Sequence, residues 1–274
     1  MKLIKIGKWK IYPIEMGTFW LDGGAMMGSV PKVLWAKTNI PDSLNRIKLA
    51  LRCLLVDDGK NLVLIETGIG NKNSNKFCNM FNIDIKNTLS DTLSDIGYSI
   101  ENIKHVILTH LHFDHAGGAT MFDVDGSIVP TFPNAKYYIT AKNWNAAINP
   151  NPKDRASYLK ENFMILHEKG ILEIIPENST ILDGISTYVV NGHTHGQQLV
   201  RVSDEESTLF FCSDLIPLKS HLSLPWIMGY DLNASLTLDE KKAFLDLASQ
   251  NKWILYFYHD PEVVAVTIEK KENR

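Results

Sequence analysis

Short apolar runs separated by polar turns recur along the chain and predict a structure rich in β-strands. Nine runs have the length and the content of branched or aromatic residues typical of buried strands. They cover residues 47–56, 62–66, 105–109, 136–140, 185–190, 198–202, 208–212, 253–257 and 263–268. The pattern therefore places strands in the first, middle and last thirds of the chain.

Helical patterns lie between some of these runs. Apolar residues recur at helical spacing over 85–96, just before Gly97. An N-cap asparagine followed by proline predicts a second helix over 151–169. A capping box at 237–240 predicts the start of a third. No repeat or low-complexity linker divides the 274 residues, so we predict one α/β domain over 1–274, with two mixed sheets between helices.

Two apolar segments are predicted as loops. Residues 23–28 combine glycines with Met26, and residues 217–231 carry Trp226 and Tyr230 with little periodicity. Either loop could line the mouth of a pocket, or could simply pack its own side chains. The pattern leaves both interpretations open.

Composition excludes several classes of protein. Hydrophobic residues make up 45% of the chain and the net charge is −3, so we expect no nucleic-acid partner. Three widely spaced cysteines argue against a disulfide framework and against a cysteine-rich zinc site. No signal peptide and no apolar stretch long enough to span a membrane is recognised. We therefore expect a cytoplasmic protein that acts on a small molecule away from membranes, and leave a homodimer open.

Residues 109–118 concentrate metal-binding side chains. His110 and His112 are two apart, which places them on one side of an extended segment, while Asp114 and His115 follow in the next turn. The apolar run before them predicts a buried strand, which would give the ligands a rigid base. Histidine and carboxylate at these spacings indicate a metal site, with ligands for two adjacent ions.

This segment resembles the H-x-H-x-D-H signature of the metallo-β-lactamase superfamily. The rest of that family's pattern can be matched in order along residues 47–260: a histidine in a Gly-His-Thr segment, an aspartate after a strand, and a histidine near the C-terminus. The matching residues are His193, Asp214 and His259. The resemblance implies the αββα sandwich fold.

The resemblance also implies the arrangement of the ligands. His110, His112 and His193 would bind the first zinc ion, Asp114, His115 and His259 the second, and Asp214 would bridge both. Imidazole and carboxylate suit zinc, and iron, manganese or cobalt are alternatives. Two such ions activate a bridging hydroxide, and we expect Asp114 to orient that nucleophile and to carry a proton to the leaving group.

Some positions depart from the family pattern. Glu66 stands where relatives have aspartate, and we predict that it lies just outside the metal ligands. His195 is an additional histidine, which we expect beside the site or at the surface. Related lactonases often carry a tyrosine where this chain has Pro217, so Tyr230 and His221 are the candidates to substitute for it.

Within the superfamily the chain most resembles N-acyl homoserine lactonases and methyl-parathion-type hydrolases. That likeness implies a dinuclear zinc hydrolase that opens a lactone or cleaves a related ester, with residues 1–45 as an N-terminal extension contributing to the pocket. Phosphotriester and thioester hydrolysis are the alternatives. A di-iron redox protein and a non-catalytic metal-binding protein on this fold are the alternatives from other classes.

Overall fold

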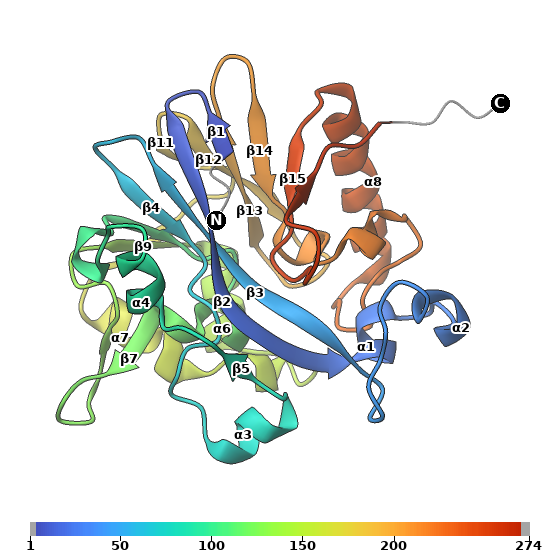
Figure 1. The fold of residues 1–274 in the computed structure, drawn as a ribbon, viewed down its shortest axis with the longest axis horizontal. Helices are drawn as coiled ribbons and strands as arrows, with labels where there is room; N and C mark the ends of the chain where they lie inside the picture. The colour runs from blue at the N-terminus through green and yellow to red at the C-terminus, as the bar shows by residue number, and fades with distance from the viewer. Residues whose placement is uncertain (1–3, 270–274) are drawn as a thin grey trace.

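Two mixed β-sheets packed face to face form the centre of the structure, a computed structural model that describes residues 4–269 (Figure 1). The first sheet has the order β1-β2-β3-β4-β6-β9-β10, and β5 pairs with β2. Its strands are β1 Ile4–Ile6, β2 Trp9–Asp22, β3 Arg46–Asp57, β4 Leu62–Ile65, β5 Asp84–Ile85, β6 His105–Ile107, β9 Lys136–Thr140 and β10 Leu172–Ile175.

The second sheet has the order β11-β12-β13-β14-β15-β16. Its strands are β11 Thr180–Leu182, β12 Ile185–Val190, β13 Gln197–Ser203, β14 Thr208–Phe211, β15 Ile254–Tyr256 and β16 Ala265–Val266. A separate hairpin pairs β7 Thr120–Phe122 with β8 Ile128–Pro130. Both large sheets contain parallel and antiparallel pairs.

Helices lie on both outer sides of the paired sheets (Figure 1). The α-helices are α1 Gly23–Met27, α2 Lys32–Trp35, α3 Asn75–Met80, α4 Leu89–Ser94, α5 Phe113–Ala116, α6 Ala141–Ile148, α7 Met164–Glu168 and α8 Ala234–Gln250. The 3-10 helices are η1 Ile100–Asn102, η2 Gly117–Ala119, η3 Arg155–Ser157, η4 Lys160–Asn162, η5 Ser213–Leu215 and η6 Lys219–Leu222. None of the helices within residues 4–269 combines the length and apolar character needed to cross a membrane.

Two buried apolar clusters hold the layers together. The larger joins the sheets, since it contains Ile65 of β4 together with Val200 and Phe211 of the second sheet. The smaller contains Phe210 and Phe244, and so packs α8 against the outer face of the second sheet. The predicted α/β class and αββα architecture are confirmed.

All nine predicted strands are present, with ends shifted by a few residues. The longest strand, β2, lies in the part of the chain predicted as an N-terminal extension and was not predicted. It pairs with β3 along its length, and its register shifts between Glu15 and Gly17. Pro13 and Gly17 interrupt the strand pattern in the sequence, and Gly17 is required because a Cβ there would lie 2.2 Å from the backbone oxygen of Asp84. Residues 1–3 of the predicted extension lie outside the described range.

The helix predicted over 151–169 is wrong as a single element. The segment forms η3, η4 and α7, with extended backbone at Tyr158 and Leu159 between the first two. Tyr158 is buried, its ring lies 4.8 Å from that of His112, and its hydroxyl bonds to that of Thr194. These tertiary contacts override the local helical pattern.

Three other local predictions also need correction. The helix over 85–96 is shorter, because residue 85 belongs to β5 and Thr88 caps α4. The loop predicted over 23–28 contains α1, whose first turn is capped by Asp22. The supposed capping box at 237–240 lies inside α8, which begins after the cap residue Asn233. The carboxylate of Glu240 instead accepts the backbone N–H groups of residues 191 and 192.

Candidate metal centre

Seven side chains from the ends of strands in both sheets converge on one buried centre. The segment after β6 supplies four of them, the turn between β12 and β13 supplies one, and the segments after β14 and β15 supply one each. They are His110, His112, Asp114, His115, His193, Asp214 and His259. Each is less than one-tenth exposed. The structure thus brings together all seven residues proposed as ligands from the sequence.

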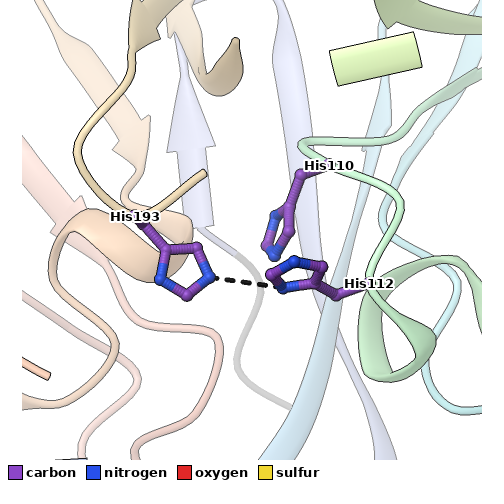
Figure 2. A group of neighbouring side chains, drawn as sticks. All are labelled: His110, His112 and His193. Carbon is purple, nitrogen blue, oxygen red and sulfur yellow. Dashed lines mark hydrogen bonds between the residues drawn. The ribbon is translucent and has the colours of Figure 1, made fainter. Parts of the chain in front are cut away.

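Three overlapping groups of these side chains have ligand atoms within 4.8 Å of one another. The first is His110, His112 and His193, which Figure 2 shows with their rings turned toward a common point. The second is His110, His115 and Asp214, and the third is Asp114, His115 and His259. The overlap makes the groups parts of a single elongated centre.

Asp214 lies between the two ends of this centre. Its Oδ2 is 3.2 Å from His193 Nε2 and 3.9 Å from His110 Nε2. Its Oδ1 is 3.4 Å from His115 Nε2 and 3.3 Å from a nitrogen of the last histidine, His259. Each carboxylate oxygen therefore faces a different set of histidines, an arrangement suited to bridging two ions.

Hydrogen bonds outside the centre orient several of the rings. His110 Nδ1 lies 2.9 Å from the hydroxyl of Thr109, and His259 Nδ1 lies 3.0 Å from the carbonyl oxygen of Ala50. His193 Nδ1 lies 2.9 Å from Asp231 Oδ1. In each case the bonded nitrogen faces away and leaves Nε2 directed into the centre.

Burial and charge set the protonation of the cluster. Burial lowers the pKa values of His110 and His112 well below the ordinary value, which keeps these imidazoles neutral as a ligand requires. Burial also opposes charge on His115, but the carboxylates of Asp214 and Asp114 outweigh it and raise the pKa of His115. Burial acts against ionised Asp214 too, yet the surrounding histidines hold its pKa well below the ordinary value.

The donor atoms fit a metal cation. Several buried side-chain atoms of the candidate ligands have no hydrogen-bond partner within the described chain, namely Nε2 of His110, Nε2 of His112, both ring nitrogens of His115 and Oδ1 of Asp214. Buried polar atoms are normally satisfied, and this set combines the imidazole nitrogens and carboxylate oxygens that zinc prefers. The site therefore has both the unsatisfied donors and the chemistry for metal binding.

Glu66 supports this centre from behind. It is fully buried, its backbone is left-handed with φ of 66°, and its Oε1 accepts the N–H of Thr109 at 2.9 Å. The same oxygen lies 3.6 Å from His115 Nδ1. The side chain therefore lies beside the candidate ligands, where the sequence placed it.

Two glycines let the backbone after α5 pack against the turn after β4. A Cβ at Gly117 would lie 2.2 Å from the oxygen of Ile69, and one at Gly118 would lie 2.1 Å from the oxygen of Thr67. Thr67 also donates from its backbone N–H and from its hydroxyl to the oxygen of His115. This close packing fixes the position of the signature segment.

The other residues singled out from the sequence lie in different environments. His221 is buried and its Nε2 bonds to the oxygen of Met26, so it is not an exposed pocket group. Met26 is buried in the main core rather than at a surface, and Trp226 packs partly buried against that core. His195 is exposed and lies in none of the ligand groups found within residues 4–269. Tyr230 is 38% exposed. Burial raises its pKa, and the carboxylate of Asp114 is one of the charges that raise it further.

The sequence did not identify Asp231, Thr109 or Glu240 as parts of this site. Asp231 is 38 positions from His193, and no motif connects them. Thr109 precedes the signature directly, and its hydroxyl lies 2.7 Å from that of Ser213. The N-terminal strand β2 was also missed, although its Phe19 ring packs 5.5 Å from that of His259.

Comparison with known proteins gives a consistent result. The sequence profile of the metallo-β-lactamase superfamily matches residues 51–259. An N-acyl homoserine lactonase of Bacillus cereus is 28% identical over 237 residues, covering 80% of this chain and 84% of that protein. A probable metal-dependent hydrolase from Staphylococcus aureus superposes with a TM-score of 0.91 at 28% identity, over 97% of this chain and 94% of the other.

A more distant solved structure shares the fold. It is a dizinc quorum-quenching lactonase in complex with a product, with a TM-score of 0.75 and 21% identity over 100% of this chain and 98% of the other. The profile match covers most of the chain and contains all seven clustered side chains. The chain therefore belongs to the metallo-β-lactamase superfamily and is a metal-dependent hydrolase with lactonase-like relatives.

Proposed function

We propose that the protein binds two zinc ions and hydrolyses a lactone or a related ester of small-molecule size. His110, His112 and His193 would hold one ion, Asp114, His115 and His259 the other, and Asp214 would bridge them. The observation that carries the proposal is the position of the Asp214 carboxylate, whose two oxygens face histidines at opposite ends of the centre.

The bound ions would supply Lewis acidity and a water-derived nucleophile at neutral pH. The chain's own groups would orient the reactants. Asp114 lies at the second end of the centre, with Oδ2 3.6 Å from His115 Nε2 and 3.5 Å from His259 Nε2. From there its carboxylate would orient the nucleophile and move a proton to the leaving oxygen.

The preference for a lactone rests on the relatives and on the apolar surroundings. The curated relative from Bacillus cereus is named as an N-acyl homoserine lactonase. Phe113 lies between candidate ligands in the chain, and its ring packs 5.2 Å from Phe77 and 5.3 Å from Phe81. These partly buried aromatic side chains, one of them within the signature segment, would suit an acyl chain or a hydrophobic ester.

Metal analysis combined with a substrate panel tests the proposal. The purified protein should contain two zinc ions per chain and should hydrolyse lactones faster than thioesters, aryl phosphotriesters or β-lactams. His112→Ala and Asp214→Ala should abolish every activity found, because the first removes a ligand of one ion and the second removes the bridging ligand. His167→Ala is the matched control, since this exposed histidine stacks on Trp144 outside the seven-residue cluster.

Different experimental results would contradict the site assignment, the metal content and the substrate class. Activity that survives both ligand substitutions would refute the site assignment. Binding of iron with visible absorbance would favour the redox alternative, and failure to bind two metal ions would favour a non-catalytic protein. Faster turnover of a phosphotriester or a thioester would replace the lactone by that substrate class.

A further inference from the structure

A buried carboxylate is bonded to the outward nitrogen of His193. Asp231 Oδ1 lies 2.9 Å from His193 Nδ1, and the side chain of Asp231 is only 1% exposed. The opposite nitrogen, His193 Nε2, lies 3.2 Å from Asp214 Oδ2. It also lies 3.3 Å from His112 Nδ1, the contact dashed in Figure 2. The ring is therefore held between an external carboxylate and the candidate centre.

This geometry determines which nitrogen is free to bind. A neutral imidazole carries one N–H, and a carboxylate can only accept a hydrogen bond. Asp231 therefore favours the proton on Nδ1 and leaves the lone pair on Nε2 facing the centre. The negative charge of Asp231 would also make His193 a stronger electron donor to a cation.

His193 differs in this respect from the other candidate ligands, all of which lie in the described range. The outward nitrogens of His110 and His259 bond to a neutral hydroxyl and to a backbone carbonyl. His115 Nδ1 lies 3.6 Å from the carboxylate of Glu66, beyond hydrogen-bond distance. The outward nitrogen of His112, Nε2, has no hydrogen-bond partner in the described part of the chain. Among these histidines a direct hydrogen bond to a buried carboxylate is thus particular to His193.

Backbone hydrogen bonds next to Asp231 hold it in position beside His193. Leu232 N donates to the oxygen of His193, and Asn233 N donates to the oxygen of Gly192. A Cβ at Gly192 would lie 2.3 Å from the hydroxyl of Thr237, so the histidine turn packs directly on the start of α8. The residues that follow Asp231 therefore hold the turn whose ring Asp231 orients.

We propose that Asp231 is a positioning residue that sets the tautomer of His193 and strengthens its binding to the first metal ion. The proposal rests on metal binding by His193 in the proposed function, and is independent of the substrate. Loss of a hydrogen-bond partner outside the ligands typically weakens metal affinity by about 10–100-fold.

Zinc competition with a chelator, together with the absorption spectrum of the cobalt-substituted protein, tests this role. Asp231→Leu should weaken one of the two zinc sites by about 10–100-fold and alter the cobalt spectrum. Asp231→Asn should lose less affinity, because the amide oxygen can still accept from Nδ1. Asp239→Asn, an exposed acid on α8, should leave both measurements unchanged.

The outcomes separate this inference from the proposed function. Wild-type protein that binds no zinc would overturn both. If the wild type binds zinc, and both Asp231 variants keep its zinc affinity and its cobalt spectrum, only the proposed role of Asp231 would be overturned. If Asp231→Leu does not fold, the Asp231→Asn variant decides: an affinity and spectrum equal to the wild type would refute the inference. A purely structural role would lower the free energy of unfolding without changing the cobalt spectrum of the folded protein.

Discussion

Some of the side chains singled out around the centre are buried in the core, while others are exposed to solvent and within reach of a substrate. His221 and Met26 are packed, and their contact joins η6 to α1. Tyr230 is more than one-third exposed, and burial together with the carboxylates of Asp22 and Asp114 raises its pKa to about 12. At neutral pH its hydroxyl is protonated and can donate a hydrogen bond.

We predict that Tyr230→Phe lowers kcat/KM by about tenfold for the best substrate of the panel, since a lost hydrogen bond costs about 1–1.5 kcal/mol. The measurement is steady-state kinetics with metal content checked in parallel. Metal content should remain at the wild-type value, because the phenol is not among the candidate ligands. An unchanged kcat/KM would remove Tyr230 from the substrate pocket.

At the scale of elements, α8 supports the segment that connects Asp214 to Asp231. Lys241 of α8 is fully buried, and its ammonium group donates to the backbone oxygens of His221, Ser223 and Trp226. Burial lowers the pKa of this lysine to about 8. One side chain thus satisfies three carbonyl groups of an irregular segment.

Lys241→Met should destabilise the protein by about 2–4 kcal/mol, because it leaves buried carbonyl groups without a donor. Urea denaturation measures this change. Lys242→Met is the matched control on the exposed neighbouring position and should change stability by less than about 0.5 kcal/mol. Equal effects of the two substitutions would contradict a supporting role for Lys241.

The close packing of η2 on the turn after β4 predicts that a larger residue at Gly118 is poorly tolerated. Gly118→Ala should cost about 1–3 kcal/mol and weaken zinc binding, since its Cβ would lie 2.1 Å from the backbone oxygen of Thr67. Gly24→Ala is the comparison, because the nearest atom there is a side-chain oxygen at 3.1 Å. Denaturation and zinc titration of both variants provide the test. Wild-type stability in Gly118→Ala would show that the turn can move.

At the scale of the whole molecule, a buried histidine makes folding depend on pH. Burial, together with the nearby charge of Lys241, lowers the pKa of His221 to about 4, although the carboxylates of Asp231 and Asp214 oppose this. In the unfolded chain the histidine has its ordinary pKa of about 6.5. Between these values the unfolded state binds a proton that the folded state does not.

The free energy of unfolding should therefore fall as pH decreases from about 6.5 to about 4, and His221 contributes about 3 kcal/mol to that fall. His221→Asn should show a correspondingly weaker pH dependence. Urea denaturation of both proteins at pH about 7 and about 4.5 measures the difference. Parallel pH profiles for the two proteins would exclude this contribution.

The sequence by itself determined nine of the strands and the chemistry of the centre, but not the long strand β2. The nine predicted strands depend on local apolar runs, and four of the seven candidate ligands lie within His110 to His115. The other three, His193, Asp214 and His259, were identified from the resemblance to the metallo-β-lactamase superfamily, whose pattern has a ligand after a strand in each of these segments. Local spacing is sufficient for the strands and for the segment from His110 to His115, since neighbouring residues in a chain cannot separate far in space.

Only the tertiary structure decided the features that depend on contacts distant in sequence. The packing of Tyr158 against His112 interrupts the helix that the pattern of 151–169 predicts. Pro13 and Gly17 weaken the strand pattern of β2, which is recognised only from its pairing with β3 and β5. Asp231 reaches His193 across 38 positions, through a segment held by Lys241. Such contacts form only when the chain folds, so local patterns and the family resemblance identified the candidate ligands but could not show which side chains hold them in place.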